Sequence, residues 1–250
     1  MIKIKLTKAK LFPGISKEVR VLEIKHDYDK ALIASDLHCE DSCRILSLLY
    51  NLALKKRCDA LVILGDLFED YHQTAKIDEV KEKVLNMIGF KDLRQTFNLI
   101  YLLSSASHDP IIPRPSVKVR NGLKLILSPY PVILRISGLR IIATHGEIMI
   151  SNGALVHMIN LVLWKLGVKL AVEKITRKAL CLNSSEWLIS GHTHIPGIDP
   201  KYKVANAGSW KLSWRKGLRY WRPSTFSYIE VEGKCLKLRM ISWEREHIRT

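Results

Sequence analysis

The sequence predicts an α/β protein, a four-layer α/β/β/α sandwich in which two mixed sheets pack together and helices cover their outer faces. Three observations indicate this fold class. Apolar runs of strand length alternate with helical repeats in the first half, short strands separated by turn residues fill most of the second half, and one long helical stretch interrupts them. Alternating strands and helices imply a parallel, helix-covered sheet, whereas closely spaced strands form antiparallel pairs.

The first half supplies three buried strands and two helices. Short apolar runs predict strands at 30–35 (KALIAS), 60–64 (ALVIL) and 98–103 (NLIYLL). Apolar residues recur at helical spacing over 42–56 and 77–88. Strands in this β-α-β-α-β order lie parallel and bring their carboxyl ends to the same edge of the sheet.

The second half supplies shorter strands and a helical insertion. We expect these strands at 123–127, 132–136, 139–143, 187–190, 203–206, 225–232 and 235–242. A helical stretch at about 154–182 lies between two of them, within an insertion at 153–182. No Pro/Ser-rich linker divides the chain, so we expect one domain over residues 1–250 that carries this helical insertion before a GHTH segment.

The composition is that of a soluble globular protein with an excess of positive charge. The chain has 250 residues, of which 47% are hydrophobic, and a formal net charge of +16. A surface adapted to high temperature would balance Lys and Arg with Glu, yet Lys and Arg outnumber Asp and Glu by 40 to 24. We therefore expect an anionic partner: a phosphate-containing substrate, nucleic acid or an acidic membrane surface.

The cysteines and the N-terminus indicate a cytoplasmic protein. The five cysteines are odd in number and unclustered, which favours free structural thiols in a reducing compartment over a disulfide framework. The first residues, MIKIKLTKAK, lack the apolar core of a signal peptide. No run of about 20 apolar residues is free of charge, so we expect no transmembrane segment.

Five polar segments each follow a strand of apolar residues. They are Asp36-Leu37-His38, Gly65-Asp66, Ser107-His108-Asp109, His145-Gly146 and Gly191-His192-Thr193-His194. Loops at the carboxyl ends of strands are the usual place for a site in an α/β fold. In Asp-x-His and His-x-His, the two outer side chains of an extended chain point the same way. His nitrogen and carboxylate oxygen suit Mn, Fe, Zn, Co or Ni, and one carboxylate can bridge two ions about 3.5–4 Å apart.

Taken singly, each segment has a plainer explanation. A lone His after a strand is more often a capped or core histidine, and an isolated Gly-Asp is more often a turn. Five such segments in order, each at the end of a strand, are improbable by chance. We therefore interpret them as one site for divalent metal ions.

The order of these segments resembles the calcineurin-like metallophosphoesterase superfamily, whose pattern reads D-x-H, G-D-x-x, G-N-H-D/E, H-G and G-H-x-H. This chain has SDLH at 35–38, GDLFED at 65–70, SASHD at 105–109, THG at 144–146 and GHTH at 191–194. The resemblance spans most of the chain's core. It implies a hydrolase that cleaves a phosphomonoester, phosphodiester or pyrophosphate bond with metal-activated water.

The resemblance also implies a role for each matching residue and two divalent ions, with manganese the first choice. The metal ligands would be Asp36, His38 and His194 for the first ion, Asp66 as the bridge, and His145, His192 and Ser107 for the second ion. His108 would stabilise the transition state or protonate the leaving oxygen. Asp109 would orient His108 through its other ring nitrogen.

Ser107 departs from this pattern, because the family has Asn there and uses its side-chain oxygen on the second metal. A serine hydroxyl is shorter and a poorer neutral ligand. Three consequences are open: water takes the place of the missing ligand, the second ion binds weakly, or the protein has lost activity. We favour weak binding of the second ion with activity kept. Ser107→Asn is then expected to tighten the second metal in a calorimetric titration.

The insertion at 153–182 has apolar residues on more than one face, together with several lysines. A core or dimer helix explains this pattern; alternatively, the segment is a cap that receives an apolar substrate or lies on a membrane. UDP-2,3-diacylglucosamine hydrolases have this superfamily pattern and a helical cap in the same interval, and GDLFE at 65–69 and GSW at 208–210 are similar to that branch. The whole chain is at least as similar to small archaeal phosphoesterases related to the double-strand-break repair nuclease.

The segment at 211–222 (KLSWRKGLRYWR) mixes basic and aromatic residues, which is typical of nucleic-acid binding. Trp210 and Trp214 fit equally well as core anchors. Three hypotheses follow: a phosphoesterase acting on small molecules or lipid headgroups, a nuclease acting on DNA or RNA with the same metals, and a non-catalytic metal-binding protein of the same fold.

Overall fold

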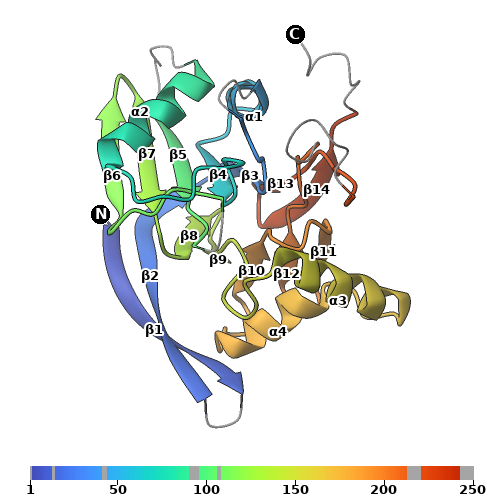
Figure 1. Cartoon of the computed structure of the whole chain (residues 1–250). Helices are drawn as coiled ribbons and strands as arrows, with labels where there is room; N and C mark the ends of the chain where they lie inside the picture. Colours follow the sequence, from blue (N-terminus) through green and yellow to red (C-terminus); the bar gives the residue numbers. More distant parts are fainter. Residues whose placement is uncertain are drawn as a thin grey trace.

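The computed structural model describes residues 2–12, 15–40, 44–89, 96–105, 108–212 and 221–242, and its strands form two seven-stranded sheets (Figure 1). The first sheet has the order β1 (Ile2–Phe12), β2 (Ile15–Tyr28), β8 (Val132–Ile136), β9 (Leu139–Ala143), β10 (Trp187–Ser190), β12 (Val204–Asn206) and β11 (Gly197–Asp199). The second has the order β14 (Cys235–Met240), β13 (Ser227–Glu232), β3 (Lys30–Ala34), β4 (Ala60–Leu64), β5 (Phe97–Leu102), β7 (Leu123–Ser128) and β6 (Ser116–Arg120).

Apolar clusters separate four layers of structure. Ile33 and Val62 of the second sheet meet Ile141 of the first sheet in the cluster between the sheets. Helices α1 (Arg44–Lys55) and α2 (Ile77–Ile88) cover the outer face of the second sheet, and α4 (Ala171–Ala179) lies against the first. Each sheet combines parallel and antiparallel neighbours. The predicted four-layer α/β/β/α sandwich of two mixed sheets is confirmed.

Parallel pairing brings the polar segments to one edge of the sandwich. Strands β3, β4 and β5 are parallel neighbours in one sheet, and β9 and β10 are parallel neighbours in the other. Backbone hydrogen bonds join the loops that follow these strands. The Asp36 amide donates to the Gly65 carbonyl at 3.2 Å, and the Gly191 amide donates to the His145 carbonyl at 2.9 Å.

A long hairpin of β1 and β2 is the largest element that the sequence analysis did not predict. The strands pair antiparallel, from Ile2 opposite Ile24 to Phe12 opposite Ile15. β1 begins IKIKL, an alternation of apolar and charged residues with the period of a half-buried strand. Ile4 and Leu6 are exposed on this edge strand, so the hairpin lacks the apolar run that identified the buried strands. The short strands β6 and β11 were missed for the same reason.

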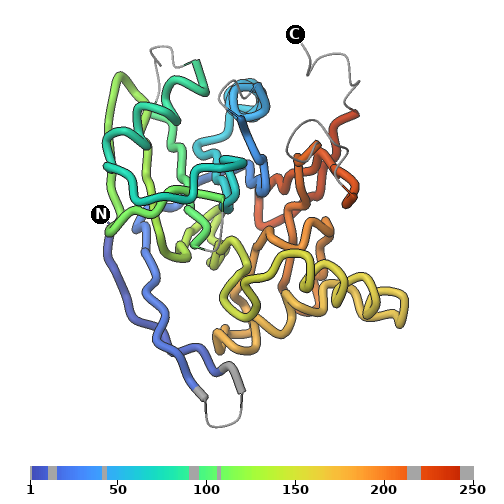
Figure 2. Tube along the Cα trace, in the orientation of Figure 1, coloured from blue at the N-terminus to red at the C-terminus, as the bar shows by residue number. Residues whose placement is uncertain are grey.

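The expected helical stretch at 154–182 is two helices. Five residues separate the end of helix α3 (Gly153–Lys165) from the start of α4 at Ala171. Between them, Gly167 (φ +87°) and Leu170 (φ +52°) adopt the left-handed conformation, which an α-helix cannot continue. The chain turns back there, and the two helices lie side by side as a hairpin at the outside of the sandwich (Figure 2).

One cysteine differs from the expectation of free thiols. Cys39 is disulfide-bonded, whereas Cys58, Cys181 and Cys235 are free. Cys39 lies in an extended bridge to Phe68. Within the described ranges, none of the helices has the length and apolar character needed to span a bilayer.

Candidate metal centre

The predicted ligands lie on strained backbone at the ends of strands. Five of them have φ between +48° and +66°, although none is glycine: Asp36, His38, Asp66, His192 and His194. The left-handed region disfavours any residue with a Cβ, at about 1 kcal/mol or more each. Such strain persists where the surrounding fold imposes it, and it is concentrated at functional sites.

Two glycines let the loops approach closely enough for the ligands to meet. A Cβ on Gly65 would lie 2.6 Å from Nδ1 of His145, and a Cβ on Gly191 would overlap Ser35 and the Asp36 carboxylate. A larger residue at either position would therefore push the ligand-bearing loops apart.

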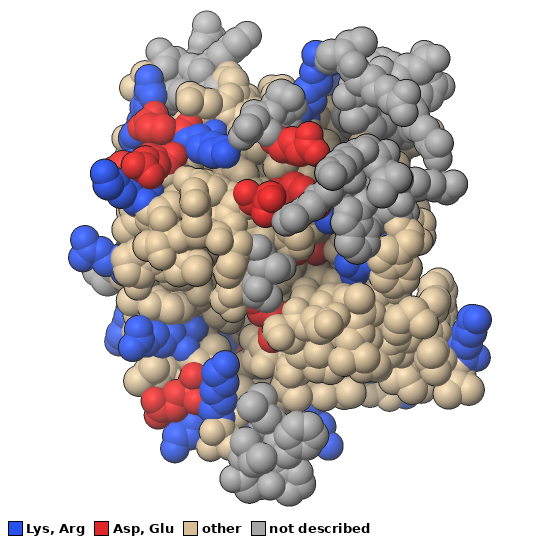
Figure 3. Space-filling model, in the orientation of Figure 1, with Lys and Arg blue, Asp and Glu red and all other residues tan. Residues whose placement is uncertain are grey.

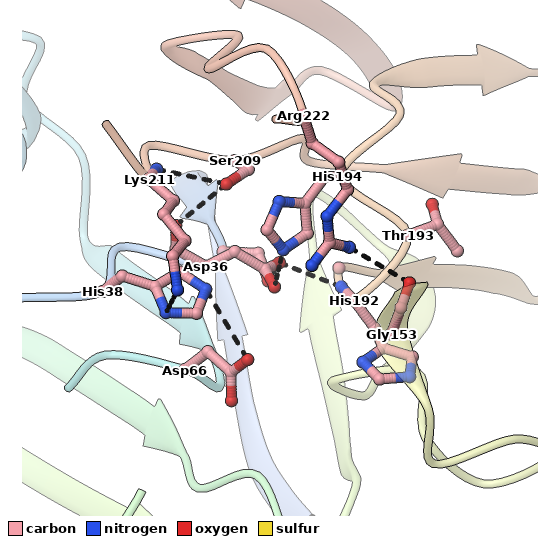
Figure 4. Close-up of polar contacts among 12 residues, drawn as sticks. Asp36, His38, Asp66, Gly153, His192, Thr193, His194, Ser209, Lys211 and Arg222 are labelled. Carbon is pink, nitrogen blue, oxygen red and sulfur yellow. Dashed lines mark hydrogen bonds and ion pairs between the residues drawn. The ribbon is translucent and has the colours of Figure 1, made fainter. Parts of the chain in front are cut away.

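The first group of ligands consists of Asp36, His38, Asp66 and His194 (Figure 4). His194 Nε2 lies 3.1 Å from Asp36 Oδ1, and His38 Nε2 lies 3.7 Å from Asp66 Oδ2. Ligand atoms of Asp36, His38 and His194 all lie within 4.8 Å of one another. Apart from the Asp36–His194 ion pair, Asp36 Oδ1 and His38 Nε2 are buried without a hydrogen-bond partner among the described residues. Buried polar atoms need a partner, and a divalent cation between them would supply it.

The second group consists of Asp66, His145 and His192. His145 Nε2 lies 3.6 Å from Asp66 Oδ2 and 3.1 Å from His192 Nδ1. The other ring nitrogens donate to backbone carbonyls, His145 Nδ1 to Leu64 at 2.8 Å and His192 Nε2 to Ile150 at 3.0 Å. With these bonds in place, His145 Nε2 and His192 Nδ1 are the ring nitrogens that would bind the metal, as in metal-binding histidines.

Asp66 belongs to both groups. Its Oδ2 faces His38 and His145, and its Oδ1 accepts a hydrogen bond from Ser104 Oγ at 2.6 Å. Ligand atoms of Asp36, Asp66 and His145 also lie within 4.8 Å of one another. A carboxylate held in this way can bridge two cations.

The electrostatics of the site favour positive charge between the carboxylates. Burial would raise the pKa of Asp36, but the neighbouring imidazoles, above all His194, hold it well below its usual range. Burial would lower the pKa of His145, but Asp66, Asp36 and Glu147 raise it to about 10. The site thus stabilises a proton on His145, and a divalent ion bound there would take the place of that proton.

His108 and Asp109 both lie at the site, but they do not form the expected pair. His108 Nδ1 donates to the Glu69 carbonyl at 2.6 Å. The Asp109 carboxylate instead accepts from the backbone amides of Asp66 at 2.8 Å, Leu67 at 2.9 Å, Phe68 at 3.3 Å and Ser104 at 2.8 Å. These amides occupy both oxygens of Asp109, which therefore positions the Asp66 loop and does not orient His108.

Two parts of the predicted site lie outside the described residues. One is Ser107, the expected weak ligand of the second metal. The other is most of the basic and aromatic segment at 211–222, of which Lys211, Leu212, Trp221 and Arg222 are described. Trp210, just before it, is fully buried, and its Nε1 donates to the Ser227 carbonyl at 2.8 Å. The core-anchor interpretation therefore holds for Trp210.

Glu69 and Lys211 support His38 and were not assigned to the site from the sequence. His38 Nδ1 lies 2.8 Å from Glu69 Oε2, and Lys211 Nζ lies 2.8 and 2.9 Å from the two Glu69 oxygens. A carboxylate on the second nitrogen of a metal-binding histidine fixes the ring and raises its basicity. The sequence signal for Glu69 was its place three positions after Asp66, and Lys211 begins the basic and aromatic segment at 211–222.

Arg222 and Glu147 are two further charged residues beside the ligands. Arg222 is 9% exposed, its Nη1 donates to the Gly153 carbonyl at 3.0 Å, and its guanidinium lies near His194 (Figure 4). Burial lowers the pKa of Arg222, whereas Asp36 and Asp66 raise it. Glu147 Oε1 accepts from the Ser105 amide at 2.5 Å. Arg222 ends the basic and aromatic segment at 211–222, and Glu147 directly follows His145-Gly146, but neither was assigned to the metal site from the sequence.

A buried network holds the GHTH loop in place. Asn206 Nδ2 donates to the Gly191 carbonyl at 2.7 Å, and it also contacts Glu173 Oε1 at 2.8 Å. Thr193 Oγ1 donates to the same Glu173 oxygen at 2.9 Å, and Asn160 Nδ2 donates to Glu173 Oε2 at 2.9 Å. Glu173 therefore joins the α3–α4 hairpin to the loop that carries His192 and His194.

Three solved structures are similar to this chain over most of its length, at low identity. A conserved uncharacterized protein described as a predicted phosphoesterase from Streptococcus pneumoniae is 15% identical, with 84% of this chain and 87% of that chain covered and a TM-score of 0.40. YfcE, a phosphoesterase from E. coli, is 20% identical, with 81% and 88% covered and a TM-score of 0.38. A single mutant of Vps29 from Entamoeba histolytica is 13% identical, with 86% and 99% covered and a TM-score of 0.41.

The family assignment rests on a different comparison. No curated protein sequence matches the chain. The family model of the calcineurin-like phosphoesterase superfamily domain matches residues 30–232, a range that includes every predicted ligand and most of both sheets. The family's common chemistry is metal-dependent hydrolysis of phosphoesters, in agreement with the ligand groups described above. The chain belongs to the calcineurin-like phosphoesterase superfamily.

Proposed function

We propose that the protein is a phosphoesterase with two metal ions that cleaves a phosphomonoester, phosphodiester or pyrophosphate bond, with manganese as its preferred metal. One observation carries the proposal: Asp66 Oδ2 lies 3.7 Å from His38 Nε2 and 3.6 Å from His145 Nε2, among buried carboxylates and imidazoles. Mixed nitrogen and oxygen ligands suit first-row transition metals. When bound, the two ions supply a water nucleophile at neutral pH and neutralise phosphate charge.

His108 is placed to act on the leaving group. Its ring packs edge-on against the ring of His38, with the centroids 4.6 Å apart, and its Nδ1 is held by the Glu69 carbonyl. Because Nδ1 carries the proton of the neutral ring, Nε2 then has a lone pair; on the protonated ring, Nε2 would donate a hydrogen bond to phosphate or its proton to the leaving oxygen.

Lys211 and Arg222 add positive charge around the first ligand group. Lys211 Nζ lies 3.4 Å from His38 Nδ1, and the charge of Arg222 interacts with both Asp36 and Asp66. A phosphoester brings negative charge that grows on the leaving oxygen as the bond breaks. Fixed cations in a buried site stabilise such charge more strongly than water does.

The test is hydrolysis of bis-p-nitrophenyl phosphate and p-nitrophenyl phosphate by the metal-free chain, before and after addition of Mn²⁺. We expect turnover only with metal. His108→Ala should lose about 10²–10⁴-fold in kcat while still binding Mn²⁺ in a calorimetric titration. His26→Ala, an exposed histidine on β2, is the matched control. A wild-type chain that binds two ions but hydrolyses neither ester would favour the non-catalytic metal-binding hypothesis.

A nuclease is the second candidate, and a cavity beside the metal ligands favours it. The cavity has a volume of about 360 Å³ and is lined by Lys17, Arg20, Tyr130 and His145, among others. Arg20 Nη1 donates to Tyr130 Oη at 3.2 Å. Cations and an aromatic ring next to a metal ligand suit a nucleic-acid strand. Salt-sensitive cleavage of single-stranded DNA or RNA, weakened in Lys17→Ala and Arg20→Ala but with unchanged bis-p-nitrophenyl phosphate turnover, would select this function.

A further inference from the structure

Helix α3 is apolar on the side that faces away from the protein. Its inward side buries Val156, His157 and Asn160. On the opposite side, one row of side chains at helical spacing is 46–73% exposed: Leu155, Met158, Val162 and Leu166. A helix that is hydrophobic around its whole circumference is normally buried on all sides. The exposed row therefore has the character of a contact surface.

The charged residues in the segment that carries this row are all positive. No Asp or Glu occurs from residue 148 to residue 172, and the only Lys or Arg residues there are Lys165 and Lys169. Both lysines are exposed at the outer end of the hairpin, next to the exposed Trp164 and Val168. Figure 3 shows this part of the molecule as a broad area of uncharged residues with basic residues at its outer end. Apolar side chains, a tryptophan and flanking lysines are the features of a helix that lies in a membrane interface.

We propose that α3 and the turn that follows it dock on the surface of an anionic lipid bilayer, a use of this surface that does not depend on the proposed hydrolysis. In this arrangement Leu155, Met158, Val162 and Leu166 enter the headgroup region. Lys165 and Lys169 contact anionic headgroups, and each basic residue near such a surface adds to the attraction.

The net charge favours a bilayer over a second copy of the chain as the occupant. Each chain carries a formal net charge of +16, so two chains that meet through α3 would repel each other. Such a dimer would also contain the basic ends of both α3–α4 hairpins, which adds like charge to the assembly. An anionic bilayer attracts the same charge.

The docking surface begins at the metal centre. The Gly153 carbonyl at the start of α3 accepts from Arg222, and His157 Nδ1 donates to the Thr193 carbonyl at 2.7 Å. Helix α3 extends outward from these contacts (Figure 1). A bilayer on its outer face would therefore hold the ligand groups close to the lipid headgroups.

Sedimentation with vesicles tests the proposal. The full chain is mixed with vesicles of phosphatidylcholine alone, or of phosphatidylcholine with phosphatidylglycerol, and the bound fraction is measured at low and high salt. We expect binding to the anionic vesicles that weakens as salt increases. Val162→Asp should weaken this binding about tenfold or more, because it places a charge in the apolar interface.

Matched variants separate docking from general effects of charge. Val119→Asp makes the same change at an exposed valine on β6, 71% exposed, and should bind as the wild type does. The double variant Lys165→Gln, Lys169→Gln should bind the anionic vesicles less, and its binding should depend less on salt. The control double variant Lys234→Gln, Lys237→Gln, on the β13–β14 hairpin, should show smaller changes in binding and in salt dependence. Circular dichroism confirms that each variant is folded.

Three results would overturn the proposal. The first is absence of wild-type binding to the anionic vesicles. The second is equal loss of binding in Val162→Asp and Val119→Asp. The third is a wild-type dimer in sedimentation equilibrium that Val162→Asp dissociates, because a second copy would then cover the exposed row.

Discussion

Oε2 of Glu69 lies 2.8 Å from Nδ1 of His38, on the opposite side of the imidazole ring from the nitrogen that faces Asp66. The Glu69 carboxylate thus holds the His38 nitrogen that faces away from Asp66, and Lys211 holds that carboxylate in turn. This chain of contacts links a residue of the C-terminal segment to the first ligand group.

Glu69→Gln should weaken binding of the first metal ion by about 10–100-fold, the usual effect of removing a partner of a ligating histidine. The amide keeps the shape of the side chain but removes the charge that raises the basicity of His38. Calorimetric titration with Mn²⁺ measures the change. Asp70→Asn, which removes an exposed neighbouring carboxylate, is the control. Equal effects of the two substitutions would contradict the role given to Glu69.

Metal should stabilise the folded chain, because the ligands are buried and meet only in the folded state. At a Mn²⁺ concentration of about 100 times Kd, each site adds about 2.7 kcal/mol to the free energy of unfolding. The melting temperature should therefore rise by several degrees with Mn²⁺ and fall back with a chelator. Asp66→Asn should abolish most of this shift, since Asp66 serves both groups. Asp29→Asn, at an exposed position, should leave it intact.

Glu147→Gln should weaken the second ion selectively. Glu147 Oε2 is buried and has no hydrogen-bond partner among the described residues, and its charge raises the pKa of the neighbouring His145. We expect about a tenfold loss of affinity, or about 1.4 kcal/mol, a modest value for the loss of an opposite charge near a partly buried cation. Glu18→Gln is the control, because Glu18 is exposed and lines the same cavity as Glu147. A two-site titration in which only the first ion weakens would contradict the assignment.

Glu173→Gln should destabilise the fold by about 1–3 kcal/mol. Glu173 is buried and accepts hydrogen bonds from Asn160, Thr193 and Asn206. Glutamine would direct its NH₂ group at one of these donors, so that this NH₂ group and the donor that it faces would both lack an acceptor. Urea unfolding measures the loss. Glu79→Gln, on the exposed side of α2, should change stability little. A similar loss in both variants would show that the network does not depend on the carboxylate.

Local patterns determined the central strands and one helix. The strands at 60–64, 132–136, 139–143 and 187–190 and the helix at 77–88 have the bounds that the sequence predicts. Each is an apolar run or helical repeat bounded by turn or charged residues, so the residues that form the element also mark its ends. The β1–β2 hairpin lacks such a run, because its edge strand β1 intersperses lysines among its apolar residues.

The sequence by itself determined which strand ends carry the candidate metal ligands, because a ligand set requires particular atoms in a particular order along the chain. Only the tertiary structure decided which groups support those ligands. Asp109 bonds to the backbone around Asp66, over 40 positions away, and Arg222 reaches Gly153 from 69 positions away. These hydrogen-bond partners come together only once the sheets have packed. Contacts between segments far apart in the chain produce no repeating pattern in the sequence.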